Sequence, residues 1–378
     1  MLIKLLGKFT LMLGPMEEGI IMKQLAVSSL TLGLLLSATS VVTSAEVRYH
    51  LTPIVVDDPP TGLLPLGLNN KGQVVGPDAG LSTRSFAWRN GEYVDLGAFF
   101  DPSTPVIDAE GINDRSDVVG AYLIPAENAF RGFLLRGNEV IGVEAVAGEA
   151  HVFLRDINNR NQIVGTTHDT SFFGRPFVWD RGEAMLLAPL AGGSAADANH
   201  INDRGIVVGG SDSAEGVRAV IWREGEAIDL GVVPGALSSF GTNLNNRGQV
   251  VGAVQFTVDE FGVVPDVRAF VWERGVMSEL PSLTGARISG PSDINNKGDI
   301  VGSTVFIDAA TQIPRSVATM WANGVGVDLQ NLIRSDNPLQ PFVTLEVALE
   351  INDRGQIVAR GRDSRTNDFN AYLLSPSR

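Results

Sequence analysis

The stretch Leu244-Asn245-Asn246-Arg247-Gly248-Gln249-Val250-Val251-Gly252 belongs to a set of seven related copies in this chain of 378 residues. The other six copies begin at Leu68, Ile112, Ile157, Ile201, Ile294 and Ile351. Successive copies are 43 to 57 residues apart. Recurrence of one short apolar phrase at this period indicates an array of a single structural unit.

The centre of the phrase, Asn-x-x-Gly between two apolar runs, predicts a tight turn between two strands. The Asn side chain can accept a hydrogen bond from the backbone two residues on, which starts a type I turn. The last turn residue then takes the left-handed conformation that Gly adopts without strain. Asn161 is the next best residue there, and Ser116 fits least well. The other five copies carry Gly72, Gly205, Gly248, Gly298 and Gly355.

Each unit continues with two further apolar runs, so four strands are expected per unit. A third strand of the type Ala-Phe-Val-Trp is followed by a second turn, and a fourth ends in Asp-Leu-Gly, as at 94–97 and 228–231. Leu135 and Leu374 replace the aromatic residue in two copies. We expect this position to lie in the core between sheets, although a row of aromatic rings is also typical of a carbohydrate platform. All five tryptophans of the chain occupy it: Trp88, Trp179, Trp222, Trp272 and Trp321.

Four antiparallel strands repeated seven times predict an all-β fold, a seven-bladed β-propeller. The last copy has no fourth strand, whereas a spare apolar run, 47–56, precedes the first copy. Pairing of that run with the last unit would complete its sheet and close the ring. A closed ring leaves no terminal unit to cap. An open β-solenoid is the alternative.

The combined pattern Ile-Asn-x-x-Gly-Gln-Ile-Val-Gly, Ala-Phe-x-Trp-x-x-Gly and Asp-Leu-Gly resembles that of the HAF-repeat family of bacterial extracellular proteins. Residues 268–272, Arg-Ala-Phe-Val-Trp, and 85–88, Ser-Phe-Ala-Trp, are the nearest matches to the motif that names the family. The resemblance extends over 47–374 and implies secretion or surface exposure. It implies no catalytic residues. The chain departs from the pattern at Ser116, Leu135, Asn161, Ala359 and Leu374.

Residues 1–45 are predicted to be an upstream extension followed by a secretory signal peptide, and 46–378 a single repeat domain. Met22-Lys23 starts a basic, then apolar, then small-residue sequence that ends in Thr43-Ser44-Ala45. This order is typical of a signal peptide with Met22 as its true start. A membrane anchor is the alternative, but the apolar run is shorter than the roughly 20 residues that span a bilayer. We expect an extracellular or periplasmic protein without an integral membrane anchor.

Charge and cysteine content limit the classes of partner and cofactor that this chain can bind. Removal of 1–45 takes away three Lys and two Glu from 29 basic and 43 acidic residues, leaving 26 and 41 and a formal charge of −15. Such acidity disfavours nucleic acid and anionic membranes as partners. The chain has no cysteine, which excludes thiolate zinc sites, iron–sulfur clusters and a cysteine nucleophile. We expect a monomer without cofactor.

The long connections between strands are the predicted ligand site. They are 253–267, 303–316 and 331–346, in units five to seven. Loops on a rigid scaffold often carry binding residues; neutral variation in length is the alternative. The carboxylates among the candidates would suit Ca²⁺, although a solvated acidic surface is the simpler interpretation. The candidate ligand-binding residues are Asp259, Glu260, Phe261, Asp266 and Asp308.

A second set of polar residues precedes the phrase and should border a central channel: Asp156, His200, Asn243, Asp293 and Glu350. These residues suggest a hydrolase or lyase at the channel mouth as the alternative function. We interpret them as ordinary polar residues next to turns, since the sequence has no Gly-x-Ser-x-Gly, His-Glu-x-x-His or phosphate-binding loop. The favoured function is a non-catalytic binding or scaffold module for a glycan, protein or cell-envelope ligand. A purely structural surface component is a third reading.

Overall fold

The computed structural model describes residues 47–54, 62–78, 84–105, 107–144, 150–168, 174–257, 266–308, 310–311 and 313–377. Residues 1–45, with the predicted signal peptide, lie outside these ranges, as do Asp259, Glu260 and Phe261. The described residues belong to the unit Glu46–Arg378 and form strands with two short 3-10 helices. None of their helices is long and apolar enough to cross a membrane.

The four predicted strands are present in each repeat, and we number the repeats as units 1 to 7 in chain order. Unit 1 has β2 (Gly67–Leu68), β3 (Val74–Asp78), β4 (Arg84–Arg89), β5 (Glu92–Asp95) and helix η1 (Leu96–Phe99). Unit 2 has β6 (Ile107–Ile112), β7 (Val118–Ile124), β8 (Ala129–Arg136) and β9 (Glu139–Val143). Unit 3 has β10 (His151–Ile157), β11 (Ile163–His168), β12 (Gly174–Asp180) and β13 (Glu183–Leu186). Unit 4 has β14 (Ala196–Ile201), β15 (Val207–Ser211), β16 (Arg218–Arg223) and β17 (Glu226–Asp229).

The later units follow the same order. Unit 5 has β18 (Ser238–Leu244), β19 (Val250–Gln255), β20 (Val267–Glu273) and β21 (Val276–Glu279). Unit 6 has β22 (Ile288–Ile294), β23 (Ile300–Ile307), β24 (Pro314–Ala322), β25 (Val325–Asp328) and helix η2 (Leu329–Leu332). Unit 7 has β26 (Val343–Ile351), β27 (Ile357–Asp363) and β28 (Phe369–Pro376), and its fourth strand is β1 (Tyr49–Ile54).

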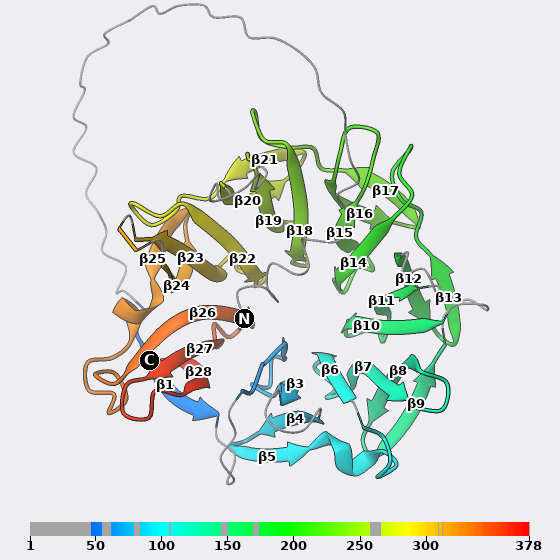
Figure 1. Ribbon diagram of the computed structural model, residues 1–378, viewed down its shortest axis with the longest axis horizontal. Helices are drawn as coiled ribbons and strands as arrows, with labels where there is room; N and C mark the ends of the chain where they lie inside the picture. Colours follow the sequence, from blue (N-terminus) through cyan, green and yellow to red (C-terminus); the bar gives the residue numbers. More distant parts are fainter. Residues whose placement is uncertain are drawn as a thin grey trace, which may run out of the picture. The chain divides into compact units, whose positions relative to one another are not determined.

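Antiparallel meanders of four strands are the building element. Five of the sheets have four strands, and the sixth has eight because a single parallel pair, Val267 with Ile288, joins units 5 and 6. The units follow one another around a common centre, with their first strands innermost (Figure 1). Each first strand contacts the first strands of the units before and after it, and β2 contacts β26 of the last unit.

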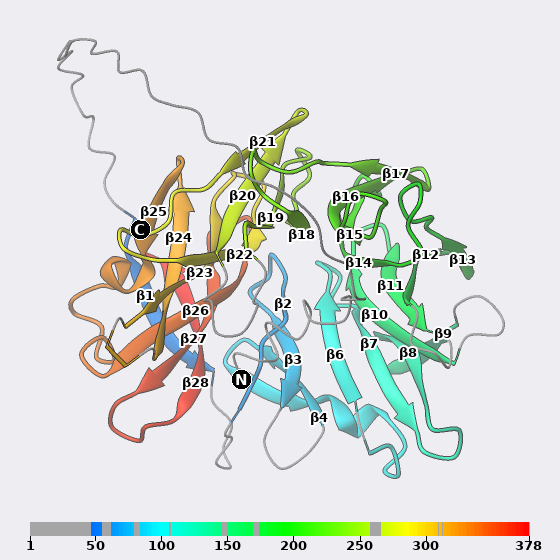
Figure 2. The ribbon, with the colours of Figure 1, turned by 45° about the horizontal axis from the view of Figure 1, so that its top comes forward.

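The predicted pairing of the N-terminal strand with the last unit is confirmed. Strand β1 runs antiparallel to β28, from Tyr49 opposite Pro376 to Ile54 opposite Ala371. The tilted view in Figure 2 shows β1, in blue, beside the strands of unit 7. The 331–342 part of one predicted loop insertion packs against this edge strand. Asn337 Nδ2 donates to Leu51 O at 3.0 Å, so this connection covers the unpaired edge of β1.

The core lies between consecutive sheets. Seven hydrophobic clusters each combine side chains from two adjacent units, and one of them joins unit 7 to unit 1. Because neighbouring residues of a strand point to opposite faces, Val250 packs towards unit 4 and Val251 towards unit 6. The repeated apolar pair therefore fills the spaces on both sides of every sheet.

The tryptophan position is part of this core, as predicted. Trp222 and Trp321 are each 1% exposed. Their Nε1 atoms donate to Ala188 O at 2.7 Å and Pro281 O at 2.8 Å. Leu135 takes the equivalent place in unit 2 and is also buried. Burial of the rings leaves no row of exposed tryptophans to stack on sugars, so the carbohydrate-platform reading of this position is not supported.

The turns also have the predicted geometry. Gly72 has φ of 78°, and the two substitutes, Ser116 and Asn161, adopt the same region with φ of 73° and 65°. Ser116 therefore keeps the turn despite its poor intrinsic preference. In units 1, 3, 4, 5 and 6 the second turn is a two-residue hairpin with positive φ at both residues, such as Asn90 and Gly91 in unit 1. This type matches the twist of the flanking strands.

Candidate functional site at the centre of the units

A cavity of about 150 Å³ lies where the first strands end, and residues from all seven copies of the phrase line it. Its wall has two layers. The turn layer consists of the two residues that follow the first strand, Asn-Asn or Asn-Asp. The strand layer consists of the polar residues that precede the phrase. Because these polar groups converge on one axis, the cavity is a candidate binding or catalytic site.

The first Asn of each copy connects its own turn to the next unit. In unit 4, Asn202 Oδ1 accepts hydrogen bonds from the backbone nitrogens of Arg204 and Ile206, both at 3.0 Å. Its Nδ2 donates to Asn245 O in unit 5, also at 3.0 Å. The same link recurs from unit to unit, and Asn352 Nδ2 of unit 7 donates to Asn69 O of unit 1 at 3.0 Å. The donors of this first cycle are Asn69, Asn113, Asn158, Asn202, Asn245, Asn295 and Asn352.

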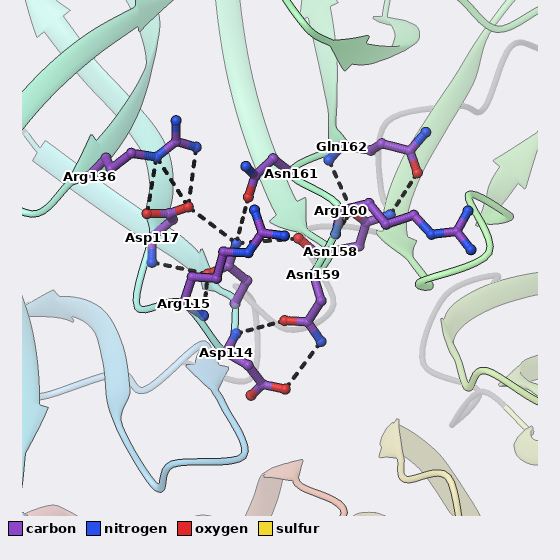
Figure 3. A network of polar contacts seen from close by, with 10 residues as sticks. Asp114, Arg115, Asp117, Arg136, Asn158, Asn159, Arg160, Asn161 and Gln162 are labelled. Carbon is purple, nitrogen blue, oxygen red and sulfur yellow. Dashed lines mark hydrogen bonds and ion pairs between the residues drawn. The ribbon is translucent and has the colours of Figure 1, made fainter.

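The second residue of each turn forms a second cycle. The backbone nitrogen of Asp114 donates to Asn159 Oδ1 at 2.9 Å, and Asn159 Nδ2 donates back to Asp114 Oδ2 at 3.1 Å (Figure 3). Corresponding backbone links join every neighbouring pair and return from Asp353 N to Asn70 Oδ1 at 2.9 Å. The members of this second cycle are Asn70, Asp114, Asn159, Asp203, Asn246, Asn296 and Asp353.

Amide and carboxylate alternate around the second cycle, and this pattern has an electrostatic reason. Asp203 Oδ2 accepts from Asn159 Nδ2 at 3.3 Å and from Asn246 Nδ2 at 2.9 Å. A carboxylate only accepts hydrogen bonds, whereas an amide also donates. Strict alternation is impossible among seven members. The one break is the amide pair Asn246 and Asn296, so no two carboxylates are adjacent and like-charge repulsion is avoided.

The strand layer is polar in units 3 to 7 and has glycines, Gly67 and Gly111, in units 1 and 2. Asp156 Oδ2 accepts from Ile201 N of the next unit at 2.9 Å. Asp293 Oδ2 accepts in the same way from Ile351 N at 2.7 Å. Each carboxylate therefore links two consecutive first strands, which agrees with the interpretation of these residues as structural polar groups.

His200 and Asp293 are the least satisfied members of this layer. His200 Nδ1 lies 3.2 Å from Asp156 Oδ2, but its orientation is wrong for a hydrogen bond and it has no other partner among the described residues. Asp293 is 7% exposed, and burial raises its pKa, an effect that the nearby His200 opposes. A buried carboxyl with a raised pKa is a feature of some acid–base sites, yet both oxygens of Asp293 already accept backbone hydrogen bonds.

Two of the loop residues predicted to bind a ligand are described, and each is held by its own hairpin. Asp266 forms two hydrogen bonds with Arg268, at 2.9 and 2.7 Å, and Arg268 also stacks on Phe256. Asp308 accepts from Ala310 N and from the backbone and side chain of Thr311. The hydrogen bonds from Thr311 and Ala310 lower the pKa of Asp308. Among the described residues, no group of three or more His, Asp or Glu side chains could hold a metal ion.

Sequence reasoning found the turns but missed the two cycles. The signal was present in the second turn position, which is Asn or Asp in all seven copies and never the cation, Lys or Arg, that occupies the third position of every copy. A turn alone tolerates many residues there. Restriction to these two types indicates a contact beyond the turn itself.

Comparison with known proteins gives the fold and no family. No protein-family model matches the chain, and no curated protein matches its sequence. Pyrococcus horikoshii acylaminoacyl peptidase is 9% identical over 87% of this chain and 52% of its own, with a TM-score of 0.51. The fold is that of β-propeller proteins. Staphylococcus aureus virginiamycin B lyase is 10% identical over 87% of this chain and 99% of its own, with a TM-score of 0.48. The β-propeller domain of the Trilobed protease from Pyrococcus furiosus is 9% identical over 87% and 83%, with a TM-score of 0.44.

Proposed function

We propose that this chain is an exported, non-catalytic, seven-bladed β-propeller, closed by β1, that acts as a binding or scaffold module. The observation that carries the proposal is the pair of hydrogen-bond cycles at the turn end of the cavity. Their polar groups bind one another, so few remain for a substrate. Export rests on the signal-like sequence of residues 22–45.

Ring closure is supported by three independent contacts between units 7 and 1. These are the hydrogen bond from Asn352 to Asn69, that from Asp353 to Asn70, and the hydrophobic cluster that includes Val74 and Val358. An open solenoid would lack such contacts between its ends. Seven sequence copies and seven inter-unit clusters support seven blades.

The ligand face is proposed to lie at the opposite end of the units, where the second and third strands connect. The turns at the cavity end have one length in all copies, whereas the opposite connections vary and are longest at 253–267 and 303–316. A uniform, internally bonded end suits a scaffold, and a variable end suits recognition. A glycan, a protein or a cell-envelope component is the proposed ligand class.

A loop deletion tests this face. Residues 259–264 are removed, and the variant is compared with the unaltered protein and with Arg274→Ala, a control in a turn at the cavity end. We expect all three proteins to unfold at similar temperatures. Binding to a glycan array and to cell-envelope samples should be weakened only by the deletion, by roughly tenfold or more if an anchor residue is lost. Undiminished binding of the deletion variant to every ligand would remove the long loops from the site.

The second candidate is a hydrolase or lyase at the channel mouth. Its support is the 3.2 Å approach of His200 to Asp156 beside the buried Asp293. A panel of glycoside, ester and lactone substrates would be tested with the unaltered protein and with His200→Gln. Turnover that disappears in the variant would favour the enzyme over the binding module. Absence of turnover across the panel agrees with the binding module.

A further inference from the structure

Three arginines are concentrated in the otherwise acidic chain at the loop end of unit 7. The segment Ala359-Arg360-Gly361-Arg362-Asp363-Ser364-Arg365 covers most of β27 and the turn after it. It lies next to the 331–346 connection, one of the three long connections proposed to frame the ligand face. Two of these arginines have carboxylate partners in the fold, and the third does not.

Arg362 and Arg365 are paired. Arg365 forms a bidentate contact with Asp363, with Nε donating to Oδ1 at 3.0 Å. Arg362 Nε lies 3.5 Å from Glu346 Oε1, and Arg362 Nη1 donates to Asn367 O at 3.0 Å. These contacts use Asp363 of the segment and Glu346 of β26.

Arg360 is the unpaired member. It is 7% exposed, and its Nε is enclosed without a hydrogen-bond partner. Its guanidinium carbon lies 4.2 Å from the centre of the Phe369 ring. No described residue accepts a hydrogen bond from its terminal nitrogens, and these are not among the enclosed unpaired atoms, so they are the part of the side chain that meets solvent. Burial lowers the pKa of Arg360 to about 10, and the negative charge of Glu346 opposes this shift.

A second buried arginine shows what a structural role looks like in the same fold. Arg218 of β16 is 8% exposed, close to the value for Arg360. Its nitrogens donate to the carbonyl oxygens of Glu215, Val217 and Leu237, at 3.1 to 3.2 Å. A buried guanidinium without such partners is costly, because desolvation of a charge is not offset. Arg360 carries this cost while stacked on an aromatic ring that fixes its plane.

We propose that Arg360 binds an oxyanion of the ligand, a carboxylate, sulfate or phosphate group, with Phe369 holding the guanidinium and Arg362 adding a second positive charge. This inference rests on the proposed binding role and gives the ligand its chemical class. A guanidinium stacked on a ring keeps its edge free, and that edge matches an oxyanion through two parallel hydrogen bonds. Glu346 would compete with the ligand for the two cations.

Titration with small anions tests the site without knowledge of the ligand. The protein is labelled with ¹⁵N-arginine, and the Nε–Hε signals are followed as sodium acetate, sulfate or inorganic phosphate replaces chloride at constant ionic strength. We expect a saturable shift of the Arg360 signal, assigned from its loss in Arg360→Lys, with one anion preferred. The preferred anion separates a carboxylate ligand from a sulfated or phosphorylated one.

Three variants sharpen the result. Arg360→Met should lower anion affinity by roughly tenfold or more, since it removes the charge-assisted pair, and Glu346→Gln should raise it. Arg274→Lys, a change at an exposed arginine elsewhere, should have no effect. If the Arg362 and Arg365 signals shift as much as the Arg360 signal and none of the shifts saturates, the effect is charge screening and the inference is overturned. If Arg360→Met does not fold, an unchanged affinity in Glu346→Gln would overturn it instead.

The result of this test can be distinguished from the result of the test of the proposed function. The same glycan array contains neutral and acidic sugars. Binding to neutral sugars that is unchanged by Arg360→Met would overturn the oxyanion site and leave the binding module standing. A saturable anion site in a protein that binds nothing on the array or in envelope extracts would support Arg360 and count against the proposed ligand classes.

Discussion

The two ends of each unit use the same chemistry in different ways. At the cavity end, Asn202 accepts backbone hydrogen bonds within its turn, is 4% exposed and also bonds the next unit. At the loop end, Asp308 accepts similar bonds from Ala310 and Thr311, but it is exposed, and within the described part of the chain its carboxylate bonds only its own turn. A capping side chain supports the whole array only when it is buried and shared between units.

Removal of β1 should have the largest effect, because it takes away the fourth strand of unit 7 and part of the core shared with unit 6. Loss of residues 47–54 exposes the edge of β28 and removes Tyr49 and Leu51, both 2% exposed, from the core. These two side chains alone contribute about 1.5–3 kcal/mol each, against a total stability of about 5–15 kcal/mol. We expect loss of cooperative unfolding by circular dichroism in urea. A peptide of residues 47–56 should restore it, and an unchanged midpoint would show that β1 is dispensable.

Asn202→Ala tests the first cycle. The substitution leaves the buried N–H of Ile206, the partly buried N–H of Arg204 and the carbonyl of Asn245 without this partner, so we expect a loss of about 2–4 kcal/mol in the free energy of unfolding. Asn138→Ala, in an exposed turn of unit 2, is the control and should change stability by less than about 0.5 kcal/mol. Equal losses in the two variants would mean that the first cycle adds nothing beyond an ordinary turn.

Asn246→Asp tests the alternation in the second cycle. It removes the hydrogen bond to Asp203 and places two carboxylates next to each other. We expect a loss of about 1–2 kcal/mol at pH 7 that becomes smaller near pH 4, where protonation relieves the repulsion. Chemical denaturation at the two pH values measures it. A loss that is the same at both pH values would assign the effect to the hydrogen bond alone.

Asp293→Asn should have a smaller effect with a distinct pH dependence. Burial raises the pKa of Asp293, so its contribution to stability is present below the pKa of the unfolded chain and is lost as the pH rises through the folded value. The variant lacks this loss. Relative to the unaltered protein it should therefore gain stability as the pH rises above the ordinary carboxyl range. The opposite slope in urea denaturation would mean that His200 holds Asp293 in its charged form.

Much of the scaffold could be predicted from the sequence because it is repeated. Strand number per unit and the left-handed residue in each turn follow from local patterns seen seven times, and the pairing of β1 with β28 follows from the missing fourth strand of the last copy. Even Ser116, the least suitable residue for its position, takes the conformation that the other copies require.

The candidate sites could not be predicted in the same way, because they depend on contacts between units. Nothing local to Asn70 or Asp353 shows that they are neighbours, since 283 residues separate them. Likewise, only the fold shows that Glu346 of β26 pairs with Arg362 and Asp363 with Arg365, which leaves Arg360 without a carboxylate partner. The residues predicted to bind a ligand, Asp266 and Asp308, are typical of exposed loops and are engaged within their hairpins.

Amide hydrogen exchange at the two ends tests the central idea most directly. The amides of Arg204 and Ile206 at the cavity end, and of Ala310 and Thr311 at the loop end, all donate to a turn side chain. We predict that the first pair exchanges as slowly as the amides of β15, and that the equivalent amides of the other six turns do the same. The second pair should exchange far faster. Equally fast exchange at both ends would contradict the account, because the turn residues would then be surface groups and not part of a shared framework.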